Sequence, residues 1–350
     1  MAVRVGIIGA SGFTGAELLR LLAGHPEMEV VVATGDSQAG SRAADLYPSL
    51  AVAYPKLVFS PNTSDLADRH RLDVVFCGLP HGTSQEIVPG LLAQGRLVVD
   101  LGADFRLKDP ALYPRWYHAE HTVPDLLADA VYGLPELFRA ELAALGGTGL
   151  VATPGCYVTT ATLALAPLLG AGLVAPTGIV VDAASGVSGA GRPPKPTTSF
   201  CTVDEDFTAY GVLDHRHTPE IEQNLSHAAV ADVQVLFTPH LAPMNRGILA
   251  TCYARPTVPV TTAGLRDALR SAYLDEPFVV VREDPPSTKA TLGSNAVHVT
   301  AWADERTGWV VAMAALDNLT KGASGGAIQA ANVALGLPET AGLPAVALYP

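Results

Sequence analysis

The chain has 350 residues, of which 49% are hydrophobic and 16% are charged, so it can bury the cores of two domains. Its 22 Lys and Arg residues are outnumbered by 34 Asp and Glu residues, which gives a formal net charge of −12. Together with the lack of any cluster of basic residues, this acidic balance argues against nucleic acids and anionic membrane surfaces as partners.

A long uncharged stretch, residues 143–181, raises the question of a membrane span. Prolines and glycines such as Pro154, Gly155 and Pro167 cut it into pieces shorter than the ~20 residues that a spanning helix needs. We therefore expect a buried core there. The opening residues MAVRVGIIGA predict a strand rather than a cleavable signal segment. The four cysteines lack metal-ligand spacing, so the sequence predicts no metal site and a reducing, cytoplasmic compartment.

The first predicted element is a short apolar strand, Arg4–Ile8, followed by the loop GASGFTG and a helix, Ala16–Ala23. Glycines in such a loop let the backbone approach a pyrophosphate, and the helix N-terminus favours its negative charge. The glycine spacing differs from the usual G-x-G-x-x-G fingerprint, and a plain strand-to-helix turn is the alternative. The predicted dinucleotide-binding residues are Gly9, Ser11, Gly12, Phe13, Thr14 and Gly15.

The second predicted strand, Glu29–Thr34, does not end on the acidic residue that binds a ribose 2′-hydroxyl in NAD enzymes. Asp36 lies slightly beyond it, and Ser37 and Arg42 follow. These two side chains are suited to a 2′-phosphate, which favours NADP over NAD. An ordinary surface role for Arg42 is the alternative.

Two further apolar runs, Asp73–Cys77 and Arg96–Asp100, alternate with a helical stretch, Ser84–Gln94, as in βαβ units. The sequence therefore predicts a parallel sheet. The turns GLPHG and DLGADFRL follow these strands, where ligands bind in open α/β sheets. Their polar side chains, His81 and Arg106, are ligand candidates, with local capping or pairing as the alternative.

The middle of the chain holds a cysteine at the start of a predicted helix. Residues 110–149, rich in Pro and Tyr, predict a connector on the surface of the first domain. Pro154 and Gly155 then end an apolar run, and helical periodicity begins at Tyr157. This places Cys156 at a helix N-terminus, where the positive end of the helix dipole favours the reactive thiolate. A buried structural cysteine is the alternative.

The second half begins with GIVVDAASGVSGAGR, a predicted strand with a glycine-rich turn at Ser185 and Gly186. We expect close backbone approach to a bound molecule there. Further on, His215 and His217 precede Pro219 and a predicted helix. The H-x-H pair has no third and fourth metal ligand, so general acid–base chemistry fits it better. A solvated pair of histidines is the alternative.

At the C-terminal end, a strand over Trp309–Leu316 and a helix over Gly325–Leu335 are predicted. Nine motifs follow one another along the chain: GASGFTG, LPHG, DLGADFRL, YGLPE, PGCY, SGVSGAGR, HRHTPEI, FTPHLAPMNRGILAT and DNLTKGASGGA. With these motifs in this order, the whole chain resembles the N-acetyl-gamma-glutamyl-phosphate reductases, acyl-phosphate-reducing enzymes of arginine biosynthesis. That family is related more distantly to aspartate-semialdehyde and glyceraldehyde-3-phosphate dehydrogenases. PGCY together with SGVSGAGR and HRHTPEI is the most specific part.

The resemblance implies an α/β fold with two domains. A Rossmann domain that binds NADP would comprise residues 1–153 and be completed by residues 316–350. An α+β catalytic and oligomerisation domain of the semialdehyde and glyceraldehyde-3-phosphate dehydrogenase type would comprise residues 154–315. The resemblance also implies a homodimer or homotetramer.

The implied reaction is the reduction of N-acetyl-glutamyl 5-phosphate by NADPH, which yields N-acetyl-glutamate 5-semialdehyde and phosphate. Cys156 would form a thioester, and His217 would act as acid and base. The implied substrate-binding residues are His215, Arg106, Arg192 and Arg246. Beyond the first loop, the cofactor-binding candidates are Ser37, Arg42, Pro80, Ser185, Gly186 and Asn318.

Three other functions remain open from the sequence. The first is reduction of another acyl phosphate: carrier-linked aminoadipyl or glutamyl phosphate, or aspartyl phosphate. HRHTPEI argues against the aspartyl enzyme, and the net acidic charge argues against an acidic carrier protein. The second is a cysteine acyltransferase or hydrolase that uses no nucleotide. The third is a non-catalytic protein that senses a dinucleotide.

Overall fold

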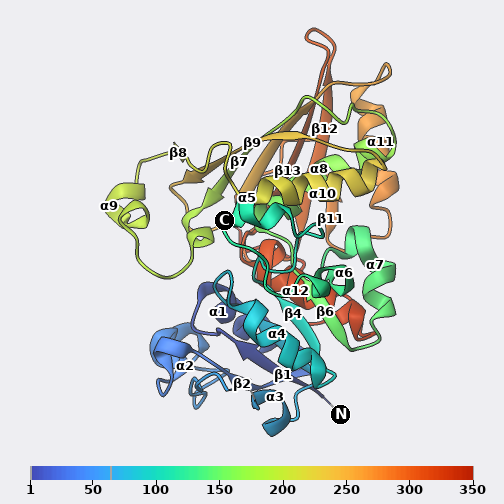
Figure 1. Ribbon diagram of the computed structural model, residues 1–350. Helices are drawn as coiled ribbons and strands as arrows, with labels where there is room; N and C mark the ends of the chain where they lie inside the picture. The colour runs from blue at the N-terminus through green and yellow to red at the C-terminus, as the bar shows by residue number, and fades with distance from the viewer. Residues whose placement is uncertain (1, 64, 350) are drawn as a thin grey trace. The chain divides into compact units, whose positions relative to one another are not determined.

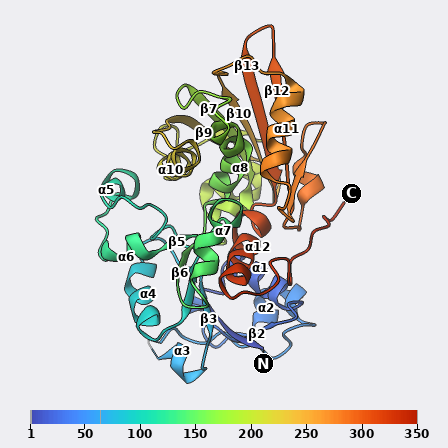
Figure 2. The same cartoon turned by 90° about the vertical axis from the view of Figure 1, so that its right-hand side faces the viewer.

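The computed structural model describes residues 2–63 and 65–349; Met1, Ser64 and Pro350 lie outside it. The chain forms two compact units, shown as a ribbon in Figures 1 and 2. Unit 1 consists of the segments Met1–Tyr113, Ala119–Pro154 and Ala323–Leu343. Unit 2 consists of the segments Pro114–His118, Gly155–Gly322 and Pro344–Pro350. The functional domain bounds predicted above, 1–153 with 316–350 and 154–315, stay a prediction.

The core of unit 1 is a six-stranded sheet in which all strand pairs are parallel, as predicted. Its strands, in spatial order, are β2 (Met28–Ala33), β1 (Val3–Ile8), β3 (Val74–Cys77), β4 (Leu97–Asp100), β6 (Gly149–Ala152) and β5 (Val131–Tyr132). Every residue of β3 and β4 is buried. Such continuous burial is expected of parallel strands covered on both faces.

Helices of unit 1 surround this sheet, and the last of them comes from the C-terminal end of the chain. They are α1 (Phe13–Leu22), α2 (Ala43–Leu46), α3 (Leu66–Arg69), α4 (Ser84–Ala93), α6 (Asp125–Asp129), α7 (Pro135–Ala144) and α12 (Gly325–Ala334), with short 3₁₀ turns η1 (Asp36–Gln38) and η2 (Pro48–Leu50). Helix α12 contacts α1, α7 and β4, which confirms the predicted C-terminal helix. Its Asn332 Oδ1 lies 3.0 Å from Nε2 of the buried His25.

The interpretation of residues 110–149 as a surface connector is wrong. Strand β5 pairs with β6 at the edge of the sheet, and α7 packs against α12. Helix α7 was hard to detect because Phe138 interrupts its helical backbone, and β5 has two residues, too few for a recognisable alternation of side chains. Helix α5 (Leu112–Tyr117) spans the first boundary between the units.

Unit 2 is built on a mixed seven-stranded sheet. In spatial order its strands are β11 (Val279–Val281), β12 (Val297–Asp304), β13 (Trp309–Leu316), β10 (Ile248–Ala254), β7 (Ile179–Gly186), β9 (Val235–Ala242) and β8 (Thr208–Ala209). Pairs β7–β9 and β11–β12 are parallel, whereas the other pairs are antiparallel. Strand β13 has the bounds predicted from the sequence.

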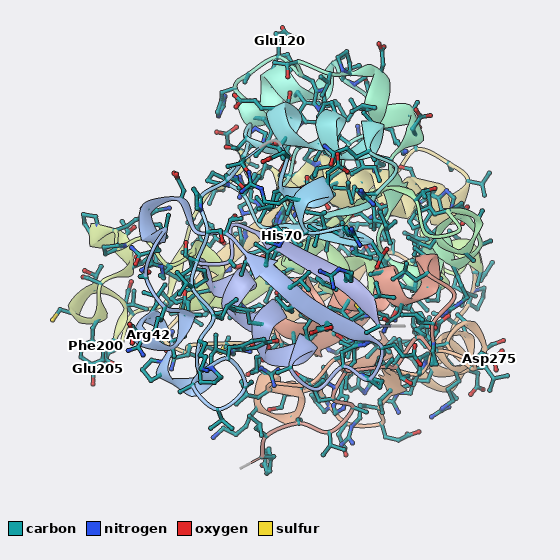
Figure 3. All side chains as sticks on the ribbon, turned by 90° about the horizontal axis from the view of Figure 1, so that it is seen from below. Arg42, His70, Glu120, Phe200, Glu205 and Asp275 are labelled. Carbon is teal, nitrogen blue, oxygen red and sulfur yellow. The ribbon has the colours of Figure 1, made fainter. Side chains whose placement is uncertain are left out.

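Helices α8 (Cys156–Gly170), α10 (His217–Ala229) and α11 (Thr262–Ala272) pack on this sheet (Figure 2). Helix α8 is buried along most of its length, as an uncharged helix must be. The shorter elements are α9 (Phe200–Val203), the 3₁₀ turns η3 (Val187–Ala190), η4 (Pro196–Thr198) and η5 (Thr288–Thr291), and the π-helical turn η6 (Thr320–Ser324). Figure 3 shows Phe200 and Glu205 at the outer end of the α9 segment. Within the described residues, no helix is long and apolar enough to cross a membrane.

Candidate active site

Cys156 is the first residue of α8, which confirms its predicted place at a helix N-terminus. The preceding residue, Gly155, is the N-cap and has an extended backbone with φ −67° and ψ 146°. Cys156 is half-buried, whereas Cys77 and Cys252 are fully buried, and burial raises the thiol pKa of both. Cys156 therefore combines partial exposure with the positive end of a helix dipole, as a reactive cysteine requires.

His217 is the first residue of α10 and packs directly against the N-terminus of α8. A Cβ atom on Gly155 would lie 2.3 Å from His217 Nε2, so any larger residue at that position would have to displace the His217 ring. The N–H group of Gly155 donates to Oε1 of the fully buried Glu220 at 3.0 Å. Two side chains on the first turn of α10 therefore hold the backbone just before Cys156.

His215 is enclosed by aromatic rings. Its ring centroid lies 5.8 Å from that of Tyr157, 5.5 Å from Tyr210, 5.3 Å from Phe237 and 4.7 Å from His217. Burial, helped by the nearby charge of Arg216, lowers the pKa of His215 to about 4. Its Nδ1 accepts the backbone N–H of His217 at 3.1 Å, so the neutral ring carries its proton on Nε2.

Two tyrosines that the sequence analysis did not single out extend this aromatic cluster. Tyr157 donates its hydroxyl to the His240 carbonyl at 2.8 Å, and Tyr210 donates to the Tyr157 oxygen at 3.2 Å. Burial raises the pKa of both phenols, that of Tyr210 to about 12. Both phenols are therefore uncharged near neutral pH.

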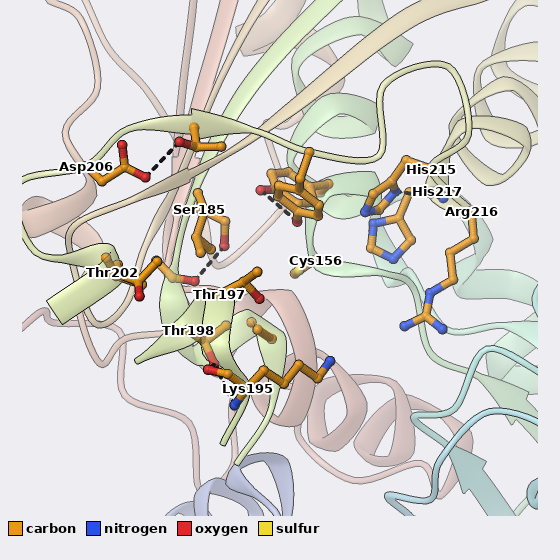
Figure 4. Close-up of a pocket in the computed structure, with 18 residues that line it drawn as sticks. Cys156, Ser185, Lys195, Thr197, Thr198, Thr202, Asp206, His215, Arg216 and His217 are labelled. Carbon is orange, nitrogen blue, oxygen red and sulfur yellow. Dashed lines mark hydrogen bonds between the residues drawn. The ribbon is translucent and has the colours of Figure 1, made fainter. Parts of the chain in front are cut away.

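A pocket of about 460 Å³ opens above these residues, entirely within unit 2 (Figure 4). Of the predicted site residues it brings together Cys156, Ser185, Gly186, His215 and His217. Its two basic side chains, Lys195 and Arg216, and its one carboxylate, Asp206, were missed. Arg216 stands inside the HRH motif, and that position was the only signal that could have drawn attention to it.

Arg192 and Arg246 are not among the residues that line this pocket. Arg246 Nη1 lies 3.4 Å from Oδ2 of the buried Asp317. Asn318 accepts the Gly247 N–H at 2.7 Å and donates to Ser188 Oγ at 3.0 Å, so it fastens the turn that follows β7. A Cβ on Gly186 would lie 2.7 Å from the Arg246 nitrogen. Contact with the chain's own backbone therefore explains a glycine that was expected to approach a bound molecule.

The loop between β1 and α1, in unit 1, fits a dinucleotide pyrophosphate. Gly9 has φ +80°, and a Cβ there would lie 2.4 Å from the Gly78 oxygen. A Cβ on Gly15 would lie 2.4 Å from Ala10 Cα, so this glycine lets α1 approach the loop. Gly12 is the N-cap of α1, and a Cβ added there would lie 3.7 Å from the nearest atom, the Gly9 oxygen. The first turn of α1 carries no acidic residue, which leaves its positive end available to an anion.

The other polar candidates of unit 1 make local contacts. Arg42, which is labelled in Figure 3, pairs with Asp45 at 2.7 Å, and both side chains are exposed. His81 Nδ1 contacts the carboxylate of the buried Asp104, which also accepts the N–H groups of Gly82 and Ser84. Arg106 Nη2 donates to the Leu101 carbonyl at 2.9 Å. These contacts correspond to the local pairing that the sequence left open as an alternative.

In the described part of the chain, no group of three or more His, Cys, Asp or Glu side chains could hold a metal ion. Two family models match the chain: "Semialdehyde dehydrogenase, NAD binding domain" over residues 4–145, and "Semialdehyde dehydrogenase, dimerisation domain" over residues 156–318. The chain is 53% identical to the N-acetyl-gamma-glutamyl-phosphate reductase of Acidothermus cellulolyticus, over 98% of both chains. It is 50% identical to that of Symbiobacterium thermophilum, over 98% of both, and 47% identical to that of Magnetococcus marinus, over 99% of both.

Solved structures agree on the fold. An aspartate semialdehyde dehydrogenase II of Vibrio cholerae superposes with a TM-score of 0.71 at 15% identity, over 95% of this chain and 98% of that one. The aspartate semialdehyde dehydrogenase of Candida albicans, solved with NADP, superposes with a TM-score of 0.70 at 16% identity, over 96% and 99%. At such low identity the likeness establishes the fold alone. It confirms the predicted combination of a Rossmann-type domain and a second α+β domain.

Proposed function

This chain belongs to the N-acetyl-gamma-glutamyl-phosphate reductases, within the semialdehyde dehydrogenase family, and on this premise we propose the reaction that it catalyses. It reduces N-acetyl-glutamyl 5-phosphate to N-acetyl-glutamate 5-semialdehyde and phosphate, a step of arginine biosynthesis. The observation that supports this most directly is the meeting of two helix N-termini, with Cys156 on one and His217 on the other.

The first step is an acyl transfer to sulfur. The Cys156 thiolate attacks the carbonyl carbon of the acyl phosphate. The bond between that carbon and the phosphate oxygen breaks, phosphate departs, and the acyl group remains bound to Cys156 as a thioester. The backbone N–H groups at the start of α8 are directed at the oxygen on which negative charge develops. In known enzymes one such donor contributes about 2.7 to 4 kcal/mol to transition-state stabilisation.

The second step releases the aldehyde. The nicotinamide cofactor, when bound, supplies the hydride that reduces the thioester carbonyl. His217 holds a proton at the oxygen of the resulting tetrahedral adduct and takes it back as the carbon–sulfur bond breaks. His215 is neutral because of its burial, so it leaves this proton transfer to His217.

The cofactor of this proposal is NADP. The β1–α1 loop, with Gly9, Gly12 and the start of α1, has the glycines and the helix end that a pyrophosphate needs. Arg42 and Ser37 are the proposed partners of the 2′-phosphate. When the cofactor binds, Arg42 would replace its exposed ion pair with Asp45 by a contact with this phosphate. Arg42→Ala is expected to reduce the preference for NADP over NAD, measured as the ratio of the two kcat/KM values.

Roles for the remaining predicted residues are part of the same proposal. Pro80, Ser185, Gly186 and Asn318 are assigned to the cofactor side, and Arg106, Arg192, Arg246 and His215 to the substrate side. We also propose a cytoplasmic homodimer or homotetramer, assembled through residues 154–315. The match of residues 156–318 to a dimerisation domain supports this assembly.

The test is the reverse reaction, in which N-acetyl-glutamate 5-semialdehyde reduces NADP and phosphate accepts the acyl group. Turnover that requires phosphate, prefers NADP over NAD and is lost in Cys156→Ala is the expected result. His217→Asn should lower kcat and alter its pH profile. Near-normal turnover by Cys156→Ser would exclude the thioester step. A wild-type protein without turnover on this substrate or on aspartate semialdehyde would point to a carrier-linked substrate or to a cysteine hydrolase.

A further inference from the structure

The charged side chains of the pocket are arranged unevenly around Cys156. Lys195 and Arg216 come from separate segments, the N-cap of η4 and the N-cap of α10. Figure 4 shows both cations on the same side of the pocket, with Asp206 on the far side of Ser185 from them. Asp206 is already engaged, because Thr208 donates its hydroxyl to Oδ2 at 2.7 Å.

Neither cation has a carboxylate partner. Across residues 2–63 and 65–349, no carboxylate oxygen lies within 4.0 Å of a side-chain nitrogen of Lys195 or Arg216. Some arginines elsewhere in unit 2 pair with a carboxylate, as Arg115 does with Asp214, Arg246 with Asp317 and Arg266 with Glu283, whereas Arg255 donates to the Thr307 and Gly308 carbonyls instead. In a chain with 12 more acidic than basic residues, two unpaired cations beside a nucleophile indicate that their counter-ions come from a ligand.

The two cations differ in the chemistry of their side chains. The planar guanidinium of Arg216 matches a phosphate through two parallel hydrogen bonds, whereas the ammonium of Lys195, on a flexible stem, acts as a point charge. This difference favours Arg216 as the phosphate ligand.

The proposed substrate, on which this inference rests, has two anionic ends. Its phosphate is attached to the carbon that Cys156 attacks, and its carboxylate lies at the other end of a five-carbon chain. We propose that Lys195 and Arg216 form a divided anion site, in which Arg216 binds the phosphate next to Cys156 and Lys195 binds the distant carboxylate. The acetylated nitrogen is uncharged and needs no counter-ion.

Steady-state kinetics in the reverse direction separate the two subsites, because phosphate and aldehyde are varied independently. Arg216→Ala should raise KM for phosphate about 10- to 100-fold, as expected for loss of a charge-assisted contact, with KM for the aldehyde changed less than about twofold. Lys195→Met should raise KM for the aldehyde by a similar factor and leave KM for phosphate unchanged. Arg216→Lys should recover part of the phosphate affinity.

The methyl ester of N-acetyl-glutamate 5-semialdehyde tests the carboxylate contact directly. Wild type and Lys195→Met should turn over this ester with equal kcat/KM, since the anion that Lys195 binds is gone. Arg306→Ala removes an equal charge from a side chain that is 84% exposed and pairs only with Asp304 at 3.8 Å. It should leave both KM values unchanged, and Tm values of all variants should match the wild type.

Alkylation gives a readout that does not depend on turnover. In the NADP-bound protein, inorganic phosphate should slow the reaction of Cys156 with iodoacetamide, followed by mass spectrometry of its peptide. The protection should persist in Lys195→Met and disappear in Arg216→Ala. Unchanged KM values with unchanged protection would overturn the divided site, and an exchange of the two effects would overturn the assignment of its halves. A wild-type protein that phosphate protects but that shows no turnover would contradict the proposed function alone.

Discussion

At the residue scale, Gly155 has no side chain, and this allows the N-termini of α8 and α10 to approach each other. Gly155→Ala keeps an allowed backbone, because φ −67° and ψ 146° suit any residue. Its added methyl group meets His217 Nε2 and must displace the ring. We expect kcat to fall about 100-fold, as small misplacements of reacting groups do, with Tm lowered by only a few degrees.

The matched control for this substitution is Gly90→Ala in α4. An added Cβ at Gly90 meets nothing within 4 Å, and alanine is the better helix former by about 0.5 to 1 kcal/mol. Turnover should be unchanged and Tm slightly raised. If Gly155→Ala also retained full turnover, the contact between Gly155 and His217 would be irrelevant to catalysis.

His215 permits a second prediction, because one substitution keeps its hydrogen-bond acceptor and another keeps only its ring. Asparagine places an acceptor near the position of Nδ1, which receives the His217 N–H, whereas phenylalanine keeps the ring and removes the acceptor. His215→Asn should retain kcat within about threefold, and His215→Phe should lose about tenfold, corresponding to one hydrogen bond.

The pH dependence of these variants distinguishes a positioning residue from a proton carrier. Burial holds the pKa of His215 at about 4, so the ring stays neutral throughout pH 6 to 8. The profile of kcat over this range should therefore be the same in His215→Asn and in wild type. Loss of an ionisation from the profile of that variant would show that His215 itself exchanges the proton.

Local sequence patterns were sufficient to place Cys156 at the start of one helix and His217 next to the start of another, because a proline–glycine break and a periodic apolar run are recognisable within a few residues. They could not identify Lys195, Tyr210 or Glu220. Tyr210 and Glu220 acquire their roles from contacts with distant segments, Tyr210 with Tyr157 and Glu220 with Gly155, and Lys195 from lining the same pocket as Cys156. No periodicity records such a contact.

At the element scale, two glycines of the β1–α1 loop have different expected roles. Gly9 is needed for folding, and Gly12 is needed for binding of the cofactor. Gly9→Ala forces an L-residue to φ +80° and drives its Cβ to 2.4 Å from the Gly78 oxygen. We expect a loss of stability of about 2 to 4 kcal/mol, because backbone strain and steric overlap add. The measurement is chemical denaturation followed by circular dichroism.

Gly12→Ala is the paired variant, since φ is −82° and the nearest atom is 3.7 Å from the added Cβ. It should keep the stability of the wild type and weaken NADP binding, which fluorescence titration measures. A Gly12→Ala protein with unchanged affinity would mean that the pyrophosphate does not approach the loop at this residue.

Strands were predicted more accurately than the short helices. Runs of buried apolar residues such as β3, β4 and β13 are visible because the whole strand is apolar or alternates regularly. Short helices such as α2, α3 and α9 have four residues each, which is little more than one turn. Their existence depends on packing rather than on intrinsic helix propensity, so no local signal marks them.

At the scale of the whole molecule, Asp100 links stability to pH. Burial raises the pKa of this carboxyl, on β4, from 3.8 to about 6. Because the pKa is raised in the folded protein, the contribution of the Asp100 carboxyl to the free energy of unfolding is fully present below pH 3.8. This contribution is lost as pH rises through about 6. At pH 7.5 the loss is on the order of 3 kcal/mol.

Asp100→Asn removes this titration and keeps an acceptor for Ser84 Oγ and for the Gly102 N–H. The difference in Tm between variant and wild type should therefore grow in favour of the variant between pH 4 and pH 7.5. Thermal melts at several pH values measure it. A difference that is constant with pH would mean that Asp100 has an ordinary pKa in the folded protein.

The parallel sheet of unit 1 and the return of the C-terminal helix were both predictable, the first from alternating strands and helices and the second from the family resemblance. The order of the seven strands in unit 2 was not. Strands β10, β7 and β9 are neighbours in this sheet, although loops and helices of different lengths separate them along the chain. Pairing between strands that are distant in sequence depends on the packing of the whole sheet.

The composition of unit 1 from three separate segments has a consequence for synthesis on the ribosome. Helix α12 fills a place against α1, α7 and β4, yet more than 150 residues are translated between α7 and α12. The sheet of unit 1 therefore has an apolar face uncovered until α12 is synthesised. During this time the main segment of unit 2, which is continuous, leaves the ribosome and folds. Chaperones that shield apolar surface have their longest opportunity to act during this interval.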